Sequence, residues 1–296
     1  MLQKAGEVKN TNIEAEGLER IQLAVIASCD DKGINTTSLA KNLREINNLT
    51  DLYNQAISEN TQITLPKTIK LNDIGYTIKL DGKVEKTLLP VEYQQVEYIE
   101  STGTQYIDTK LLASNYMDLI VEIEGNYTKT NYQYIFGAGF HYDYKTNCSW
   151  ILMGCIKDSI FGAQNGISGK EKEIDVANTQ KHTFIVDTVS NVGKVDQVSQ
   201  ILDARGVKKI NYNYVLFALN NHGIVNNNAS FKMNYCNISN NNTLIRNYIP
   251  CKSTITVTNV DGKQCSTGTI GLYDLVEGKF YTNQGNSDDF IAGPDV

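Results

Sequence analysis

The strongest constraint on the fold is a succession of short β-prone runs that fills the chain after residue 90. Each run is rich in aromatic and β-branched residues, and clusters of Gly or Asn separate it from the next. The runs are residues 117–124, 132–137, 149–154, 182–187, 214–219 and 230–239. In the first run polar and apolar residues alternate, which places Glu122 and Glu124 on one face. Many short strands with little helix predict a mainly β protein in which residues 90–296 form an antiparallel two-sheet sandwich.

The front of the chain has a different pattern. In residues 1–28 apolar side chains recur at helical spacing, which predicts a helix, although Gly17 costs it about 1 kcal/mol relative to Ala. A second helix is expected to begin after Asn35 or Thr36 and to reach Ile46, with its leucines on one face.

Strands are expected after these helices. Residues 61–65 alternate polar and apolar side chains, and Pro66 is expected to end that strand. Residues 74–86 carry Asp81-Gly82 between two alternating runs, the strongest short-range signal for a hairpin. The sequence therefore predicts a small α+β domain over residues 1–89, ahead of the sandwich over residues 90–296.

The charge balance excludes one class of partner. The chain has 33 acidic and 27 basic residues, a formal charge of −6. Nucleic-acid binding needs clustered Lys and Arg against phosphate, so no nucleic-acid partner is predicted. No run of about 18 apolar residues occurs, so the sequence predicts no membrane-spanning helix.

The chain has six cysteines, none of them in a C-x-x-C motif, so zinc and redox sites are not indicated. Buried thiols are expected. A single bridge, Cys148–Cys155 or Cys251–Cys265, is the alternative.

Two stretches of the back region resemble the concanavalin-like, laminin-G-type jelly-roll modules of bacterial surface and phage tail proteins. The first, Tyr-Ile-Glu-Ser-Thr-Gly-Thr-Gln-Tyr-Ile-Asp-Thr at residues 98–109, resembles their opening strands. The closing pattern is Asn-Tyr-Ile-Pro-Cys-Lys at 247–252, Ile-Gly-Leu-Tyr-Asp at 270–274 and Gly-Lys-Phe-Tyr at 278–281. The resemblance implies a jelly-roll sandwich that usually binds ligands and rarely catalyses reactions.

The front region resembles the soluble half of a type IV pilin or pseudopilin. The resemblance rests on residues 2–10 and 19–27, followed by a short helix and a small antiparallel sheet. In that family an apolar helix precedes such residues and anchors the subunit in membrane or fibre; this sequence is expected to begin after that helix. The resemblance implies contacts with other pilin subunits through the N-terminal helix. The alternative is a generic α+β cap.

The best candidates for ligand binding lie in one aromatic and polar segment. They are Tyr142, Asp143, Tyr144, Asn147 and Trp150, the chain's one tryptophan. Aromatic rings stack on the apolar faces of sugars, while Asp and Asn bind hydroxyl groups, so the segment indicates a glycan contact. The alternative is that Trp150 fills the sandwich core and the tyrosines cover its edge.

Motifs for catalysis are scarce. None of the three histidines lies in H-E-x-x-H, and no nucleophile elbow or P-loop occurs. Gly137-Ala138-Gly139 opens no helix, which favours a tight turn over a phosphate loop. The acids of residues 122–124 and 171–175 depart from the E-x-D-x-x-E pattern of concanavalin-like glycosidases, so solvated strand faces are expected.

No cofactor is predicted. Laminin-G-like modules often bind Ca²⁺, but the chain has no EF-hand-type calcium loop, and Asp288-Asp289 is expected to form a solvated turn.

Together these features predict an extracellular, cell-surface adhesin on a pilus-like fibre that binds a glycan or host surface molecule without catalysis. Three alternatives remain open: a phage tail or receptor-binding protein, a glycoside hydrolase on a concanavalin-like fold, and a purely structural minor pilin.

Overall fold

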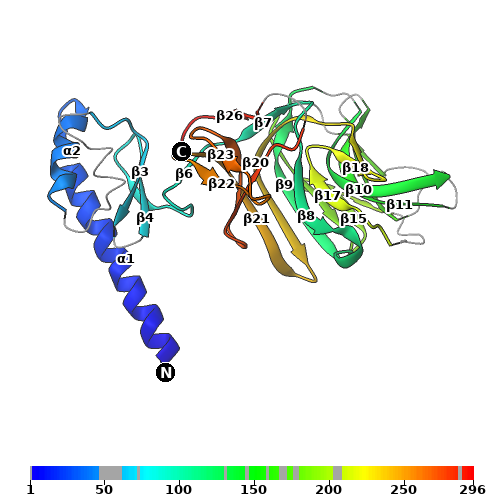
Figure 1. The fold of residues 1–296 in the computed structure, drawn as a ribbon, viewed down its shortest axis with the longest axis horizontal. Coiled ribbons are helices and arrows are strands. Elements are labelled where there is room, and N and C mark those ends of the chain that lie inside the picture. The colour runs from blue at the N-terminus through cyan, green and yellow to red at the C-terminus, as the bar shows by residue number, and fades with distance from the viewer. Residues whose placement is uncertain are drawn as a thin grey trace. The chain divides into compact units, whose positions relative to one another are not determined.

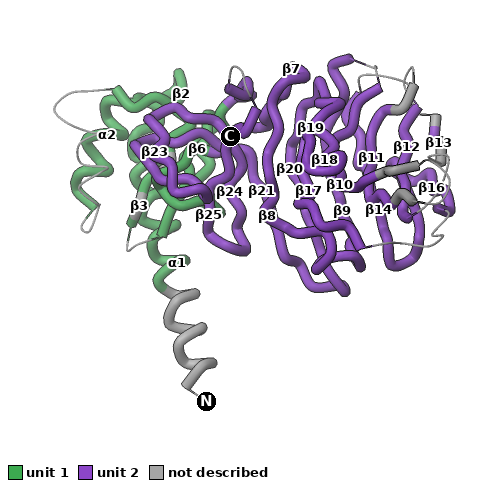
Figure 2. The backbone as a smooth tube through the Cα atoms, turned by 45° about the vertical axis from the view of Figure 1, so that its right-hand side comes forward, with its two compact units in different colours: residues 1–94, 295–296 green, residues 95–294 purple. Residues whose placement is uncertain are grey.

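The computed structural model describes residues 2–46, 62–71, 74–129, 132–143, 147–157, 160–166, 172–175, 180–202, 209–285 and 289–296. The chain is mainly β, and a long helix stands at its N-terminus (Figure 1). It divides into two compact units, which are residues 1–94 with 295–296 and residues 95–294 (Figure 2).

The first unit begins with the expected helices. Helix α1 covers Leu2–Ile26 and α2 covers Thr36–Arg44, with the short ladder of β1 (Cys29–Asp30) and β2 (Gly33–Ile34) between them. The Asn35 side chain accepts a hydrogen bond of 2.9 Å from the Ser38 N–H, which caps α2 at the position that the sequence predicts. Among the described residues, no helix is long and apolar enough to cross a membrane.

A three-stranded meander completes the unit, with β3 at Lys67–Leu71, β4 at Ile74–Ile78 and β5 at Val84–Lys86. The strand predicted at 61–65 is wrong over residues 62–65, which form no strand. Instead β3 begins directly after Pro66. A proline has no N–H to give to a ladder, so it stands outside the paired residues and precedes the strand.

The predicted hairpin is present as β4–β5, but its loop differs from the two-residue turn typical of Asp-Gly. The Gly82 N–H donates to the Lys79 carbonyl at 2.9 Å, and Gly82 has a φ of +82°. Asp81 is not among the residues with positive φ. The loop is therefore a turn closed by a left-handed glycine, which belongs to the three-residue class of hairpin loops.

Gly17 has a packing role in the first unit. An ideal Cβ at Gly17 would lie 2.3 Å from the Tyr76 hydroxyl oxygen, so only glycine admits the ring at this point of α1. Tyr76 is fully buried, and its hydroxyl donates to the Glu14 carbonyl at 3.0 Å. The glycine that weakens the helix locally lets α1 close on β4.

The second unit contains two large, mostly antiparallel sheets. The β9 sheet has the order β16 (Val198–Ile201), β15 (Val192–Val195), β14 (His182–Asp187), β9 (Leu119–Tyr127), β20 (Ser230–Asn240), β21 (Thr243–Ser253), β24 (Ile270–Asp274), β25 (Lys279–Thr282). The β10 sheet has the order β13 (Lys172–Asp175), β12 (Ile160–Gly166), β11 (Asn147–Lys157), β10 (Gln133–Asp143), β17 (Asn213–Leu216), β8 (Ile107–Leu112). Figure 1 labels β9, β15, β20 and β21 of the first of these sheets and β8, β10, β11 and β17 of the second.

Shorter elements extend these sheets. Strand β18 (Leu219–Asn221) pairs with β10 and with β19 (Ile224–Asn226). Strand β7 (Ile99–Thr102) pairs with β20 and with β26 (Ile291–Ala292). The remaining elements are β6 (Tyr93–Gln95), the 3-10 turn η1 (Ala113–Asn115), β22 (Val257–Thr258) and β23 (Gln264–Cys265).

One hydrophobic core lies between the two sheets, so the unit is sandwich-like. In β9 the side chains are alternately buried and half-buried, as the sequence predicts: Val121 and Ile123 point inward, and Glu122 and Glu124 point outward. The Phe184 ring packs edge-on against other core rings, Tyr127 at 5.5 Å among them. The core contains side chains from β10, β11 and β17 as well as from β9, β14 and β20.

The opening signature at residues 98–109 forms β7, a tight turn and β8. Gln105 is buried, and its side-chain oxygen accepts hydrogen bonds from the Thr102 N–H at 2.8 Å and the Ser101 hydroxyl at 3.1 Å. Gly103 takes a φ of +102°, which a side chain rarely permits. The residues that carry the resemblance therefore build a turn.

Residues of the closing signature form a charged cluster with Arg246 and Glu277, which directly flank it in sequence. Arg246 Nη1 lies 2.8 Å from Glu277 Oε1, and Arg246 Nε lies 3.5 Å from Asp274 Oδ2. Asp274 is fully buried, and its Oδ1 accepts a hydrogen bond from the Asn247 N–H at 2.9 Å. The Tyr281 hydroxyl donates to Glu277 Oε2 at 2.9 Å. These contacts tie β21, β24 and the turn after β24 together.

Among the described side chains, Cys29, Cys155, Cys236, Cys251 and Cys265 are thiols, and all but Cys29 are buried. Neither alternative bridge forms. Cys148 and Cys155 lie on the same strand, β11, seven residues apart, which is about 23 Å of extended chain and far beyond disulfide reach. Burial raises the pKa of the Cys236 and Cys251 thiols, so these groups stay protonated at neutral pH.

Candidate ligand-binding face

The predicted site residues belong to the β10–β11 hairpin. Asp143 is paired with Asn147 at the loop end of the ladder, and Tyr142 lies next to this pair on β10. Tyr144 lies outside the described residues. Trp150 stands three residues further along β11, opposite Gly139. The hairpin thus gathers the backbones of the described candidates at one end of the β10 sheet.

Trp150 lies on the outward face of the β10 sheet. Its neighbours Ile151 and Met153 belong to the core between the sheets, whereas Trp150 packs with Leu152 in a separate cluster. Side chains alternate along a strand, so Trp150 and Leu152 point away from the core. The alternative in which Trp150 fills the sandwich core is therefore wrong.

Two aromatic rings on this face lie against glycines of the neighbouring strand. An ideal Cβ at Gly139 would lie 2.2 Å from Trp150 Cε3, and one at Gly154 would lie 2.8 Å from Tyr134 Cδ1. Both are direct cross-strand pairs, Gly139 with Trp150 and Tyr134 with Gly154. The missing side chains let each ring lie close to the backbone of the sheet.

Gly137 and Gly139 have a different role from the turn that the sequence predicts. The tight turn predicted at residues 137–139 is absent, since β10 runs through them. An ideal Cβ at Gly137 would lie 2.8 Å from both Leu152 Cβ and Leu219 Cδ1. The two glycines serve packing across strands.

A continuous line of apolar contacts results, which we name the aromatic strip. It consists of Trp150, Leu152, Tyr134 and Tyr132. Trp150 is half-buried, Leu152 and Tyr134 are buried, and Tyr132 is 52% exposed. The rings of Tyr132 and Tyr134 meet edge to face with centroids 5.3 Å apart, and their hydroxyls are hydrogen-bonded to each other. The strip presents an aromatic ring to solvent at each end.

A hairpin of β18 and β19 borders the strip and brings polar groups to it. Its turn residues, His222 and Gly223, have φ values of 58° and 83°, as a two-residue type I′ turn requires. The His222 N–H donates to the Gly139 carbonyl at 2.9 Å. Asn221 is directly paired with Gly139, so its half-buried amide lies on the opposite side of that glycine from Trp150.

Asn221 and Tyr132 also belong to this face, although the site predicted from the sequence does not include them. Both lie outside the segment around Trp150, and only the pairing of β10 with β18 and the packing of Tyr132 on Tyr134 bring them to it. The alternation of β10 could have indicated Tyr132, because Tyr132 and Tyr134 are two residues apart.

Two of the acids considered for hydrolysis, Glu122 and Glu124, lie on the other sheet. Glu122 accepts a hydrogen bond of 2.6 Å from the Tyr235 hydroxyl, and Glu124 lies 3.0 Å from Lys181 Nζ, both on the outward face of the β9 sheet. Burial, reinforced by the Glu122 carboxylate, raises the pKa of Tyr235. Residues 173 and 175 lie on β13, and Glu171 lies outside the described residues. The two carboxylates of β9 are therefore each engaged with a neighbouring side chain.

Within the described ranges, no three His, Cys, Asp or Glu side chains lie close enough together to hold a metal ion. Asp288, named for a solvated turn, lies outside those ranges, and Asp289 is exposed.

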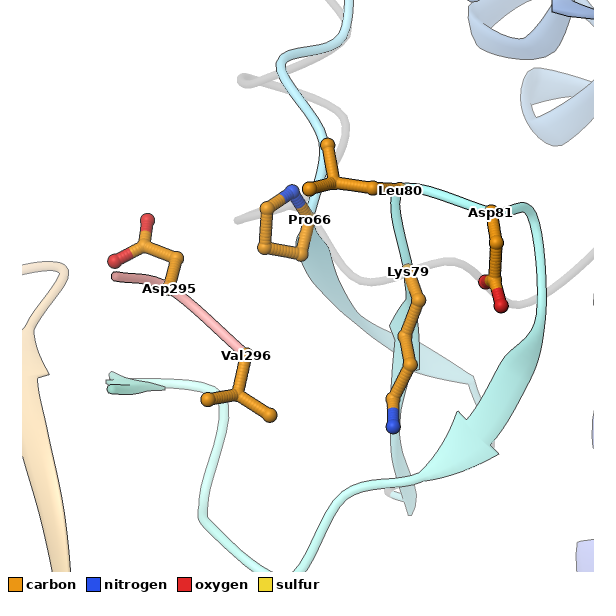
Figure 3. Close-up of a pocket in the computed structure, with 6 residues that line it drawn as sticks. All are labelled: Pro66, Lys79, Leu80, Asp81, Asp295 and Val296. Carbon is orange, nitrogen blue, oxygen red and sulfur yellow. The ribbon is translucent and has the colours of Figure 1, made fainter. Parts of the chain in front are cut away.

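A hollow of ≈ 260 Å³ lies in the first unit (Figure 3). Its lining is Pro66, Lys79, Leu80, Asp81, Asp295 and Val296. Lys79 Nζ is 2.7 Å from Glu85, so its charge is already paired. The hollow offers apolar surface with a charged margin.

The chain matches no protein-family model and no curated protein. Among solved structures it is similar to the NanB sialidase from Streptococcus pneumoniae, in a ligand complex and as a point mutant. The sequence identity is 12% for both, with TM-scores of 0.33 and 0.31. The alignments cover 69% and 68% of this chain and 39% of each sialidase chain. The chain thus spans well under half of these proteins, and likeness at this level carries no argument about activity.

Proposed function

We propose that the protein is a surface-displayed, fibre-associated adhesin whose second unit, a two-sheet jelly roll of the concanavalin-like type, binds a glycan. The observation that carries the proposal is the outward position of Trp150. The indole ring packs against Gly139 of the neighbouring strand and is half-buried, and Asn221 is paired with the same glycine on its other side. A flat aromatic surface with neighbouring hydrogen-bonding groups suits a sugar, whose faces are apolar and whose edges carry hydroxyls.

Binding without turnover is part of the proposal. A glycosidase needs two carboxyl groups that flank the scissile bond. Glu122 and Glu124 sit on the face of the other sheet, and each is held by a neighbour, Tyr235 or Lys181. This arrangement favours solvated strand faces over a catalytic pair.

Fibre association rests on the first unit. A long helix followed by a short helix and an antiparallel meander is the arrangement expected of the soluble half of a pilin-like subunit. Leu18, Leu23 and Ile26 are exposed on α1, which supports contacts of this helix with other subunits. The sequence of the gene upstream of Met1 tests this part: a prepilin cleavage site followed by about 20 apolar residues is expected.

The glycan part is tested by a titration that uses the protein's own fluorophore. Trp150 is the one tryptophan of the chain, so every change in indole emission reports on this face. Neutral and acidic oligosaccharides are added to the full chain while the emission is recorded. A saturable change with at least one glycan is expected, and Trp150→Ala should abolish binding of that glycan in a label-free assay such as calorimetry.

The matched control is Tyr235→Ala, which removes an aromatic side chain from the outward face of the other sheet. Binding should survive in this variant. Circular dichroism checks that both variants are folded. Equal loss of binding in both variants, or full binding by folded Trp150→Ala, would rule out the aromatic strip as the site.

A further inference from the structure

The end residues of the aromatic strip are partly exposed to solvent, whereas its two middle residues are buried. Tyr132 is 52% exposed and Trp150 is half-buried, whereas Tyr134 and Leu152 between them are 2% exposed. The buried pair packs with Leu219 of β18 in one hydrophobic cluster, so the two partly exposed rings lie at its two ends. One partly exposed aromatic ring therefore lies at each end of the strip, on the same face of the sheet.

The separation of these rings follows from the register. Tyr134 is opposite Gly154, which lies four residues beyond Trp150 on β11. Four residues of strand span about 13 Å, and Tyr132 stands beyond Tyr134 in the same direction. This distance exceeds the length of a single sugar ring, so one sugar cannot cover both rings.

We infer that the ligand is an extended oligosaccharide of several sugar units, laid lengthwise along β10 and β11 with one sugar stacked on Trp150 and another on Tyr132. The inference rests on the proposed glycan binding and makes it more specific, because a lone terminal sugar would use only the Trp150 end. The Tyr132 and Tyr134 hydroxyls, hydrogen-bonded to each other, add a polar edge at the second position. The Asn221 amide serves the first.

The test measures how affinity depends on chain length. Ladders of glucose, xylose, galactose and N-acetylglucosamine oligomers, from the single sugar to the hexamer, are titrated into the full chain, with Trp150 emission as the signal. For the ladder that binds, Kd should fall with each added sugar until both rings are covered, and then level off.

Two substitutions test whether a second sugar stacks on Tyr132. Tyr132→Ala should weaken the hexamer roughly tenfold, the change that about 1.4 kcal/mol of lost contact produces, and leave the disaccharide unchanged. Leu244→Ala, which removes an exposed side chain on β21 of the other sheet, is the control and should change neither. Because Tyr132 is exposed, its loss should leave the fold intact.

The outcomes separate this inference from the proposed function. Two results would contradict an extended ligand and still be consistent with glycan binding at Trp150. In the first, a single sugar binds as tightly as the hexamer. In the second, Tyr132→Ala weakens short and long ligands equally. No response to any ladder or to the wider glycan panel overturns both.

Discussion

The indole ring of Trp150 lies on Gly139, the residue directly opposite it on the neighbouring strand, and leaves no room for a side chain there. An alanine Cβ would lie 2.2 Å from Trp150 Cε3 and 2.6 Å from the Ser149 carbonyl oxygen. We expect Gly139→Ala to displace the indole, to lower the free energy of unfolding by about 1–3 kcal/mol, and to weaken glycan binding. Chemical unfolding and the emission maximum of Trp150 measure the first two effects.

Gly193→Ala is the control for this substitution. Its nearest contact would be Ala163 Cβ at 3.0 Å, and the nearest ring atom, Phe161 Cε1, would lie 3.9 Å away, which is ordinary van der Waals contact. The emission of Trp150 should stay unchanged in this variant. A Gly139→Ala protein with wild-type emission and stability would contradict the packing described for the strip.

Gly17→Ala tests the close approach of α1 and β4. Alanine is the better helix former by about 1 kcal/mol, so propensity alone predicts a more stable protein. The Tyr76 hydroxyl oxygen, 2.3 Å from the added Cβ, predicts the opposite. We expect a net loss of stability in thermal unfolding of the first unit. In combination with Tyr76→Phe the two losses should not add, because the phenylalanine removes the nearest atom. A stabilised Gly17→Ala protein would show that the ring moves aside freely.

The buried ion pair of Arg246 and Asp274 predicts a loss of stability when one charge is left without its partner. Arg246→Met would leave Asp274 buried without its ion-pair partner, and a loss of about 3–5 kcal/mol is expected in urea unfolding. The double variant Arg246→Met with Asp274→Leu should regain part of that loss, because the unpaired charge is gone. Equal stability of the single and double variants would argue against a charge effect.

The lowered pKa of Glu85 predicts a loss of stability at low pH. Hydrogen bonds from Lys79 and Lys83 lower the pKa of Glu85 from 4.5 to about 2. Since the folded-state pKa lies below the unfolded value, the stabilising effect is complete above pH 4.5 and is lost as the pH falls towards 2. An NMR titration of the Glu85 carboxyl measures the shift. Added salt should move the pKa back towards 4.5, since these charges are exposed. A pKa that salt leaves unchanged would contradict this cause.

The sequence predicts the elements of this protein better than its site. The alternation in β9 and the helix cap at Asn35 depend on residues close in sequence, and the structure has both as predicted. The sequence predicts Pro66 at the end of a strand, whereas it precedes β3; a proline can flank a strand at either end, so its position alone does not decide between the two.

Long-range pairing explains what the sequence could not indicate. In the sequence, Gly137 and Gly139 resemble turn residues. In the structure, leucines and an aromatic ring of other strands pack against them. Asn221 joins the face only through the parallel pairing of β18 with β10. Whether Trp150 points inward or outward depends on the register of a whole strand, in which a shift of one residue exchanges the two faces.

Glycan binding at Trp150 is tested most sharply by the accessibility of the indole to a collisional quencher, measured in the presence and absence of the oligosaccharides. In the free protein, acrylamide should quench the indole partially, as its half-buried position requires. A bound glycan should shield the ring and lower the quenching constant, and Tyr235→Ala should behave in the same way. One result would contradict glycan binding at Trp150: a glycan of the panel binds to the protein by calorimetry, but no glycan alters the quenching. The ligand would then bind elsewhere.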